Sequence, residues 1–156
     1  ADRLRRWEGT NRSDSLPPEW VLYTQPCHVT TWAGRVCTAY DEIPNVCPDL
    51  IYLDGPSQDS PTGASHGIHT RHPDRLPMAC DILRIEHFLL PGTLIVVDGR
   101  TANARFLVQN FQRNWRHEHD RDADVHTFEM VERPLGKLNE KQIRYCLGDD
   151  WEGLDF

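Results

Sequence analysis

The clearest hydrophobic pattern of the chain consists of two short apolar runs, each ending at an Asp-Gly pair. The sequence PDLIYLDG occupies residues 48–55, and GTLIVVDG occupies residues 92–99. A continuous apolar run of this length predicts a strand that is buried on both faces, as in a parallel sheet covered by helices on each side. We therefore expect strands over 50–53 and 93–97.

Segments with other patterns surround these two strands. Apolar residues at helical spacing predict helices over 74–90 and 101–115, the first of which is stopped by Pro91-Gly92. A Ser-, Gly-, Pro- and His-rich stretch predicts a loop over residues 57–73. Further short strands are expected over 20–24, 36–40, 125–131 and 143–147, and the last two should pair antiparallel because the link between them is too short for a full helix.

The order of these elements predicts an α/β fold. Alternation of strands and helices requires right-handed crossovers and a mostly parallel sheet with helices on both faces, closed by a terminal antiparallel strand. A length of 156 residues suits one domain. We expect that domain over 1–148 and a tail over 149–156.

Charge and cysteine content narrow the classes of function. A net charge of -7 disfavours general nucleic-acid binding, and no apolar run approaches the ~20 residues that span a membrane. The five cysteines form no CxxC pair, which indicates reduced thiols and a cytoplasmic protein. Two of them, Cys80 and Cys146, lie in apolar runs and should be packed as small hydrophobic side chains.

Asp54 and Asp98 are the candidate catalytic residues, because ligands of open α/β sheets bind beyond the carboxyl ends of the strands. If the two strands are neighbours, both carboxylates face one cleft. There they could hold a divalent metal or act as base and polar anchor. The alternative that each aspartate only caps a turn stays open.

At this point the sequence resembles a known family. The PDLIYLDG strand, the HFLLPGTLIVVDG junction and the expected hairpin over 125–147 are similar to the carboxyl-terminal half of class I, Rossmann-like, S-adenosylmethionine-dependent methyltransferases, and most of all to the catechol and caffeoyl-type O-methyltransferases. The resemblance implies methyl transfer to a small-molecule acceptor. It also implies that Asp54 and Asp98 bind a divalent metal. Gly99 stands where the family has Asn, so Asn103 is the expected third ligand.

The loop after the first strand supplies the remaining candidates. By the same resemblance it helps form the acceptor pocket, with Ser57, His66 and His69 as substrate-binding residues. Arg100 could contact an anionic substrate, or could pair with one of the two aspartates. The spacing of His66, His69 and His72 would also allow zinc or nickel binding, but substrate contact is the favoured interpretation.

One departure limits the resemblance. The chain contains no GxG, so the glycine-rich cofactor loop of the family is missing. A non-enzymatic α/β oligomerisation or interaction module, which would form a homo-oligomer through its open sheet edge, is therefore the alternative function. A histidine- and aspartate-rich stretch over 117–126 is interpreted as a solvated loop and strand start, since it lacks the register of a calcium loop.

Overall fold

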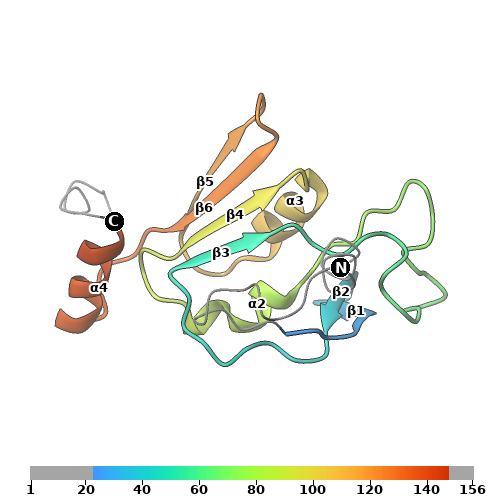
Figure 1. Cartoon of the computed structure of the whole chain (residues 1–156), viewed down its shortest axis with the longest axis horizontal. Helices are drawn as coiled ribbons and strands as arrows, with labels where there is room; N and C mark the ends of the chain where they lie inside the picture. The colour runs from blue at the N-terminus through green and yellow to red at the C-terminus, as the bar shows by residue number, and fades with distance from the viewer. Residues whose placement is uncertain (1–22, 148–156) are drawn as a thin grey trace, which may run out of the picture. The chain divides into compact units, whose positions relative to one another are not determined.

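The computed structural model describes residues 23–147, which divide into two compact units (Figure 1). The first unit contains the chain up to Pro44 together with Gly55–Asp81. The second contains Asn45–Asp54 and the chain from Ile82 onward. Each unit is described by itself.

The first unit is built on an antiparallel hairpin of β1 (Cys27–Trp32) and β2 (Arg35–Tyr40). Ala33 and Gly34 form its two-residue turn with φ of 47° and 77°, the left-handed backbone that tight hairpin turns require. The strand expected over 36–40 is confirmed. The strand expected over 20–24 falls mostly outside the described residues, and Tyr23 and Thr24 are not in a strand.

The helix expected over 74–90 is wrong for most of its length. Only α2 (Asp81–Ile85) and the short 3-10 helix η2 (Glu86–Phe88) are helical. Residues 77–80 are extended instead, because the carbonyl of Met78 and the N–H of Cys80 bond to the backbone of Thr38 in β2. These backbone groups are no longer available to a helix.

The expected loop over 57–73 is confirmed, and it is well anchored. The side-chain amide of Gln58 donates to the carbonyls of His72, Pro73 and Arg75 at 3.0 Å each. The hydroxyl of Thr70 donates to the carbonyl of Gln58 at 2.7 Å. The loop is therefore held by polar contacts without regular secondary structure.

The second unit contains a four-stranded sheet in the order β3-β4-β6-β5, formed by β3 (Leu50–Leu53), β4 (Leu94–Asp98), β5 (Trp115–Asp120) and β6 (Val125–Met130). The strands β3 and β4 run parallel, whereas β6 lies between β4 and β5 and runs antiparallel to both. The strands expected over 50–53, 93–97 and 125–131 are confirmed to within one residue.

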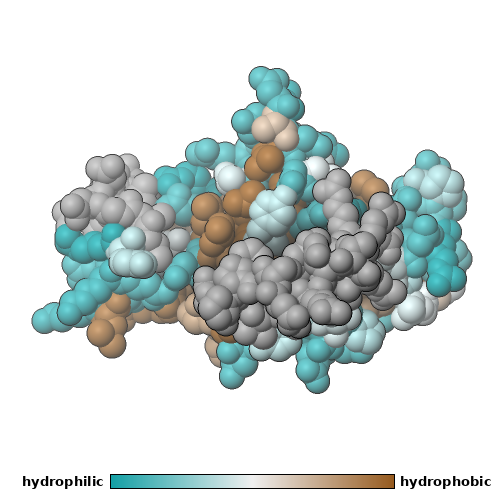
Figure 2. Space-filling view, in the orientation of Figure 1, coloured by the Kyte–Doolittle hydropathy of each residue, from teal (hydrophilic) through white to brown (hydrophobic). Residues whose placement is uncertain are grey.

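The two faces of this sheet differ. The helix α3 (Thr101–Asn110) packs against β4 and β6, where Ile95, Val97 and Phe128 have no exposed surface. Leu50 and Tyr52 project from the other face of β3 and are 59% and 61% exposed. Figure 2 shows apolar side chains as a band over the strands that Figure 1 labels β4 and β6.

The expected fold class is therefore wrong. Of the three strand pairings in the sheet only β3–β4 is parallel, and the three α-helices described, α2, α3 and α4, are short. Among residues 23–147, α3 packs on one face of this sheet while Leu50 and Tyr52 are exposed on the other, which contradicts a sheet with helices on both faces. The four-stranded sheet is mixed, and a separate two-stranded sheet accompanies it.

Two further expectations fail towards the carboxyl end. The helix expected over 101–115 ends at Asn110, and the expected loop over 117–124 is largely the strand β5. Residues 143–147 belong to the helix α4 (Lys137–Leu147) instead of a strand. Residues 137–147 are rich in good helix formers, and Asn139 and Ile143 of this helix are buried while Tyr145 is 90% exposed.

Some predictions lie outside the described residues. These are the tail over 149–156 and the packing of the Cys146 side chain. Cys80 is buried, as expected. Among the residues from 23 to 147, no helix is long and apolar enough to cross a membrane.

Candidate functional site

Asp54 and Asp98 lie at the same edge of the four-stranded sheet. The register of the parallel pair places Leu53 opposite Val97, so the next residue of each chain segment is an aspartate. Neighbouring strands are about 5 Å apart. Asp54 and Asp98 therefore lie next to each other at the carboxyl ends of β3 and β4, as the sequence predicted.

The carboxylate of Asp98 is already engaged by a side chain from the neighbouring strand. The hydroxyl of Tyr52 donates a hydrogen bond to Oδ2 of Asp98. Residues 52 and 98 both point to the open face, since Tyr52 is opposite Val96 and side chains alternate along a strand. This hydrogen bond marks the open face as the side on which Asp98 can meet a ligand.

The carboxylate of Asp54 faces a cation. Nε of Arg100 lies 3.7 Å from Oδ1 of Asp54, and the arginine side chain is 19% exposed against 57% for the aspartate. Of the roles considered for Arg100, pairing with one of the aspartates is thus the one that the structure contains. Two carboxylates and one guanidinium give this edge a formal charge of -1.

Asn103, the expected third metal ligand, is placed differently. It is 1% exposed and lies with Ala104 and Leu107 on the buried face of α3. That face packs against the side of the sheet opposite to the side on which Asp98 projects. The structure does not gather Asn103 with the two carboxylates on one face.

The remaining candidates belong to the first unit. The hydroxyls of Ser57 and Ser60 are 2.7 Å apart, and the carbonyl of His69 accepts a hydrogen bond from Arg75. His66 is exposed and has a left-handed backbone, with φ of 52°. In the first unit these residues make local loop contacts.

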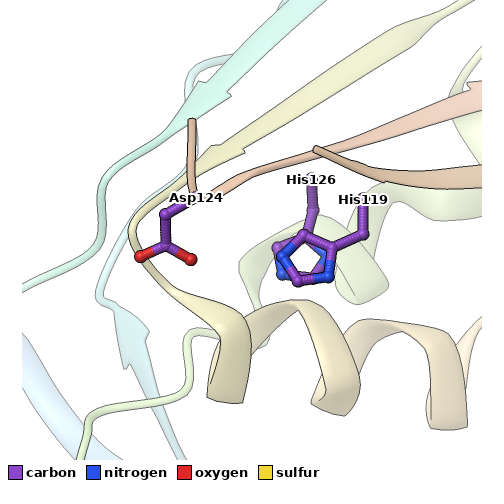
Figure 3. A group of neighbouring side chains, drawn as sticks. All are labelled: His119, Asp124 and His126. Carbon is purple, nitrogen blue, oxygen red and sulfur yellow. The ribbon is translucent and has the colours of Figure 1, made fainter. Parts of the chain in front are cut away.

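A second polar cluster lies at the tip of the β5–β6 hairpin. His119, Asp124 and His126 each offer a ligand atom, and these atoms lie within 4.8 Å of one another. His119 and His126 are directly opposite in the antiparallel register, so they share a face, and Asp124 follows the turn. Figure 3 shows the two rings overlapping beside a helical turn of the ribbon.

His126 is the fixed member of this cluster. It is 3% exposed, and both ring nitrogens have partners. Nε2 lies 3.0 Å from the hydroxyl of Thr101 in the first turn of α3, and Nδ1 lies 2.9 Å from Nε2 of His117. Burial, followed by the neighbouring His119, lowers the pKa of His126 and that of His117 below the ordinary value.

The imidazole rings stack. His119 and His126 have ring centroids 3.8 Å apart with an angle of 11° between planes, and His117 stacks on Phe128 at 4.5 Å. Two protonated rings would repel at such a distance. Lowered pKa values keep His117 and His126 neutral at neutral pH, which is the form that can bind a metal ion.

Sequence reasoning named these residues but treated most of them as a solvated loop. A usable signal was present, because His117 and His119 are two apart and so are Asp124 and His126. A period of two over a short turn predicts a hairpin with these side chains on one face. Hydropathy alone hides it, since imidazoles count as polar residues.

Comparisons with models of known protein families, with curated proteins and with solved structures found no match.

Proposed function

We propose that the carboxyl edge of β3 and β4 binds a small organic molecule carrying a hydroxyl or amino group, and that this molecule serves there as a methyl acceptor. The observation that supports the proposal is the adjacency of Asp54 and Asp98 at the ends of two parallel strands. In open α/β sheets, ligands bind beyond the carboxyl ends of parallel strands, and β3 and β4 are the parallel pair of this mixed sheet. Methyl transfer as the reaction class rests on the resemblance described above.

The charge of the edge favours a hydrogen-bond donor over an anion. With Arg100 paired to Asp54, the carboxylate of Asp98 is the group left to receive a ligand, and in the free chain it accepts the hydroxyl of Tyr52. An acceptor hydroxyl would replace the tyrosine hydroxyl in that hydrogen bond. Asp98 would then accept a charge-assisted hydrogen bond from the hydroxyl or amino group of the bound molecule.

S-adenosylmethionine, which the resemblance implies, would supply the methyl group. The residues present do not fit this cofactor, because no two glycines are spaced as GxG and the first two described strands form an antiparallel hairpin instead of a strand, loop and helix. The residues of this edge therefore bear on the acceptor molecule alone.

An NMR titration of the whole chain with catechol, a neutral dihydroxy probe, tests the proposal. We expect the backbone signals of Asp54, Gly55, Asp98 and Gly99 to shift. The variant Asp98→Asn should weaken binding about tenfold or more, as loss of a charge-assisted hydrogen bond does. The exposed Asp59→Asn, in the first unit, is the matched control and should bind as the unchanged chain does.

Two results would contradict the proposal. One is the absence of shifts at this edge up to millimolar catechol, and the other is equal binding by both variants. Parallel titration with S-adenosylhomocysteine separates the two parts of the proposal. If catechol binds and S-adenosylhomocysteine does not, the small-molecule site is supported and methyl transfer as its reaction is contradicted.

Self-association is a second candidate function. The strand β3 is an edge strand of the four-stranded sheet, and its side chains Leu50 and Tyr52 are exposed. Such an edge can pair with a second copy of the same strand. Sedimentation at several concentrations tests this, and Leu50→Lys should abolish any dimer that forms through β3.

A further inference from the structure

We propose that the β5–β6 hairpin carries a binding site for a divalent transition-metal ion, with zinc as the reference ion and His119, Asp124 and His126 as its ligands. This inference goes beyond the acceptor site and does not depend on it. The hairpin residues point to the α3 side of the sheet, whereas Tyr52 and Asp98 point to the open face.

The donor atoms select the class of ion. Two imidazole nitrogens and one carboxylate oxygen suit zinc, nickel, copper or ferrous iron. Calcium and magnesium prefer sets composed of oxygen atoms. Within residues 23–147 this is the single group of three or more His, Cys, Asp or Glu side chains whose ligand atoms come together in this way.

The ligand atoms are close enough for modest side-chain movement to complete the site. They lie within 4.8 Å of one another. In a tetrahedral zinc site with bonds of about 2.1 Å, ligand atoms are about 3.4 Å apart. His119 and Asp124 are exposed and can turn, whereas His126 is buried and keeps its place.

The stacked rings show which movement is required. Because the planes of His119 and His126 differ by only 11° and the ring centroids are 3.8 Å apart, their nitrogen lone pairs lie in two separate, nearly parallel planes and do not converge on one point. Rotation of the exposed His119 ring about its side-chain bonds removes the stack and aims a nitrogen at the ion. Metal binding should therefore separate the two rings while the hairpin backbone stays in register.

The hydrogen bonds of His126 identify Nε2 as its metal-binding atom. Its Nδ1 is paired with Nε2 of His117, an arrangement that orients a metal-binding imidazole from its far side. Its Nε2 meets the hydroxyl of Thr101, and the same hydroxyl lies 3.4 Å from Oδ1 of Asp124. In the metal-free chain the threonine hydroxyl bridges two of the proposed ligands, and the ion would take over this role.

Three protein ligands leave one position of a tetrahedral ion open. A water molecule or another small ligand would fill it, as in zinc sites that are not purely structural. The site is thus expected to exchange this fourth ligand with the solvent.

The test is titration of the whole reduced chain with cobalt(II), whose visible absorption reports coordination, followed by displacement with zinc. We expect one ion per chain and a spectrum without a thiolate charge-transfer band, because no cysteine is proposed as a ligand. His119→Gln and Asp124→Asn should each weaken binding more than about 100-fold, since loss of an outer partner alone costs 10–100-fold. Asparagine tolerates the left-handed backbone of residue 124, so this variant should fold.

Two control variants make the result specific. Thr101→Ala and His69→Gln should both keep the 1:1 stoichiometry, because neither residue is a proposed ligand. His69→Gln should also leave the affinity unchanged. The proposal is overturned if His69→Gln weakens cobalt binding, or if a thiolate band appears at the first equivalent of cobalt. It is also overturned if folded His119→Gln binds as tightly as the unchanged chain, or if one equivalent of cobalt gives no spectral change.

Discussion

The guanidinium of Arg113 forms an ion pair with the carboxylate of Glu132. Its Nε donates to both carboxylate oxygens, at 3.1 and 3.2 Å, and its Nη2 donates to Oε2. The same guanidinium donates to the carbonyls of Glu86 and Leu89. One side chain thus connects the segment after β6 to the segment before β4. Arg113 precedes β5 and Glu132 follows β6, so the pair lies at the open end of the β5–β6 hairpin, whereas the proposed ligands lie at its tip.

This pair predicts a pH dependence of stability. Hydrogen bonding by Arg113 lowers the pKa of Glu132 below its ordinary value of 4.5. A carboxyl whose pKa is lower in the folded than in the unfolded chain stabilises the fold above its unfolded value, and this contribution is lost as pH falls through the folded value. Glu132→Gln should cost about 1.5–3 kcal/mol of unfolding free energy at neutral pH.

Urea unfolding of both chains at neutral pH and at several values below 4.5 measures this. The difference between the unchanged chain and Glu132→Gln should shrink as the pH falls. A difference that stays constant across the range would show that the charge of Glu132 contributes nothing.

Gly92 predicts a stability effect of a different kind. Its φ is 88°, and an added Cβ would lie 3.1 Å from Cγ1 of Ile143 in α4. Gly92→Ala should therefore combine backbone strain with displacement of a buried side chain, at about 2–4 kcal/mol in total. Gly34→Ala is the matched control, because its φ is 77° and nothing lies within 4 Å of an added Cβ.

Chemical denaturation of the two alanine variants separates the terms. Gly34→Ala should cost about 1 kcal/mol, the size of the strain alone. Equal losses in both variants would mean that α4 does not pack against residue 92 in solution.

The cysteines predict an order of chemical reactivity. Burial, followed by the charge of Asp81, raises the pKa of Cys27 to about 11, and a hydrogen bond with Cys80 together with burial raises the pKa of Cys37. Cys47 is exposed. Because the thiolate is the reactive form, Cys47 should react with iodoacetamide at about pH 8 at least ~100-fold faster than Cys27.

Peptide mapping of the alkylated chain by mass spectrometry reads each cysteine separately. Denaturant should bring Cys27, Cys37 and Cys80 to the reactivity of Cys47. Early labelling of Cys27 in the folded chain would contradict the packing of the β1–β2 hairpin.

The strands were predictable where hydrophobic side chains dominate. Residues 50–53 and 94–97 are apolar without interruption, and both are strands. Their shared edge, with Asp54 and Asp98, followed from that pattern. The open face did not follow, because an apolar run is the same whether a helix covers it or it remains half exposed, as Tyr52 is.

The strand β5 was not predictable from hydropathy. Its inward positions hold Trp115, His117 and His119, whose rings stack on Phe111, Phe128 and His126, respectively. Five of its six residues are exposed, since it is an edge strand. Ring stacking therefore stabilises this strand in place of the alternating apolar side chains that a strand normally packs against a core. Because imidazoles count as polar in a hydropathy pattern, the candidate metal site was not recognised from the sequence either.

The helix expected over 74–90 failed because a tertiary contact overrode a local pattern. Ala79 and Cys80 have helical spacing with Leu83, yet their backbone completes a bridge to Thr38 in β2. Nothing in residues 74–90 encodes that partner. Local periodicity could not have found it.

Glu86 is the buried acid that sequence reasoning did not single out, and it carries the last prediction. It is 2% exposed, and its Oε1 accepts the backbone N–H groups of Gln112 and Arg113 at 2.9 Å each and the indole N–H of Trp115 at 3.0 Å. Glu86→Gln keeps the shape but removes the charge and can turn an N–H toward these donors. We expect a loss of about 2–3 kcal/mol.

The exposed Glu118→Gln in β5 is the matched control and should change stability by less than about 0.5 kcal/mol. Urea unfolding at neutral pH compares the two variants. Glu86 holds the link between α3 and β5 and is not a proposed metal ligand. Glu86→Gln should therefore weaken cobalt binding at the hairpin tip less than Asp124→Asn does. A Glu86→Gln chain as stable as Glu118→Gln would mean that the three N–H donors find other partners, and that β5 is held by its pairing with β6 alone.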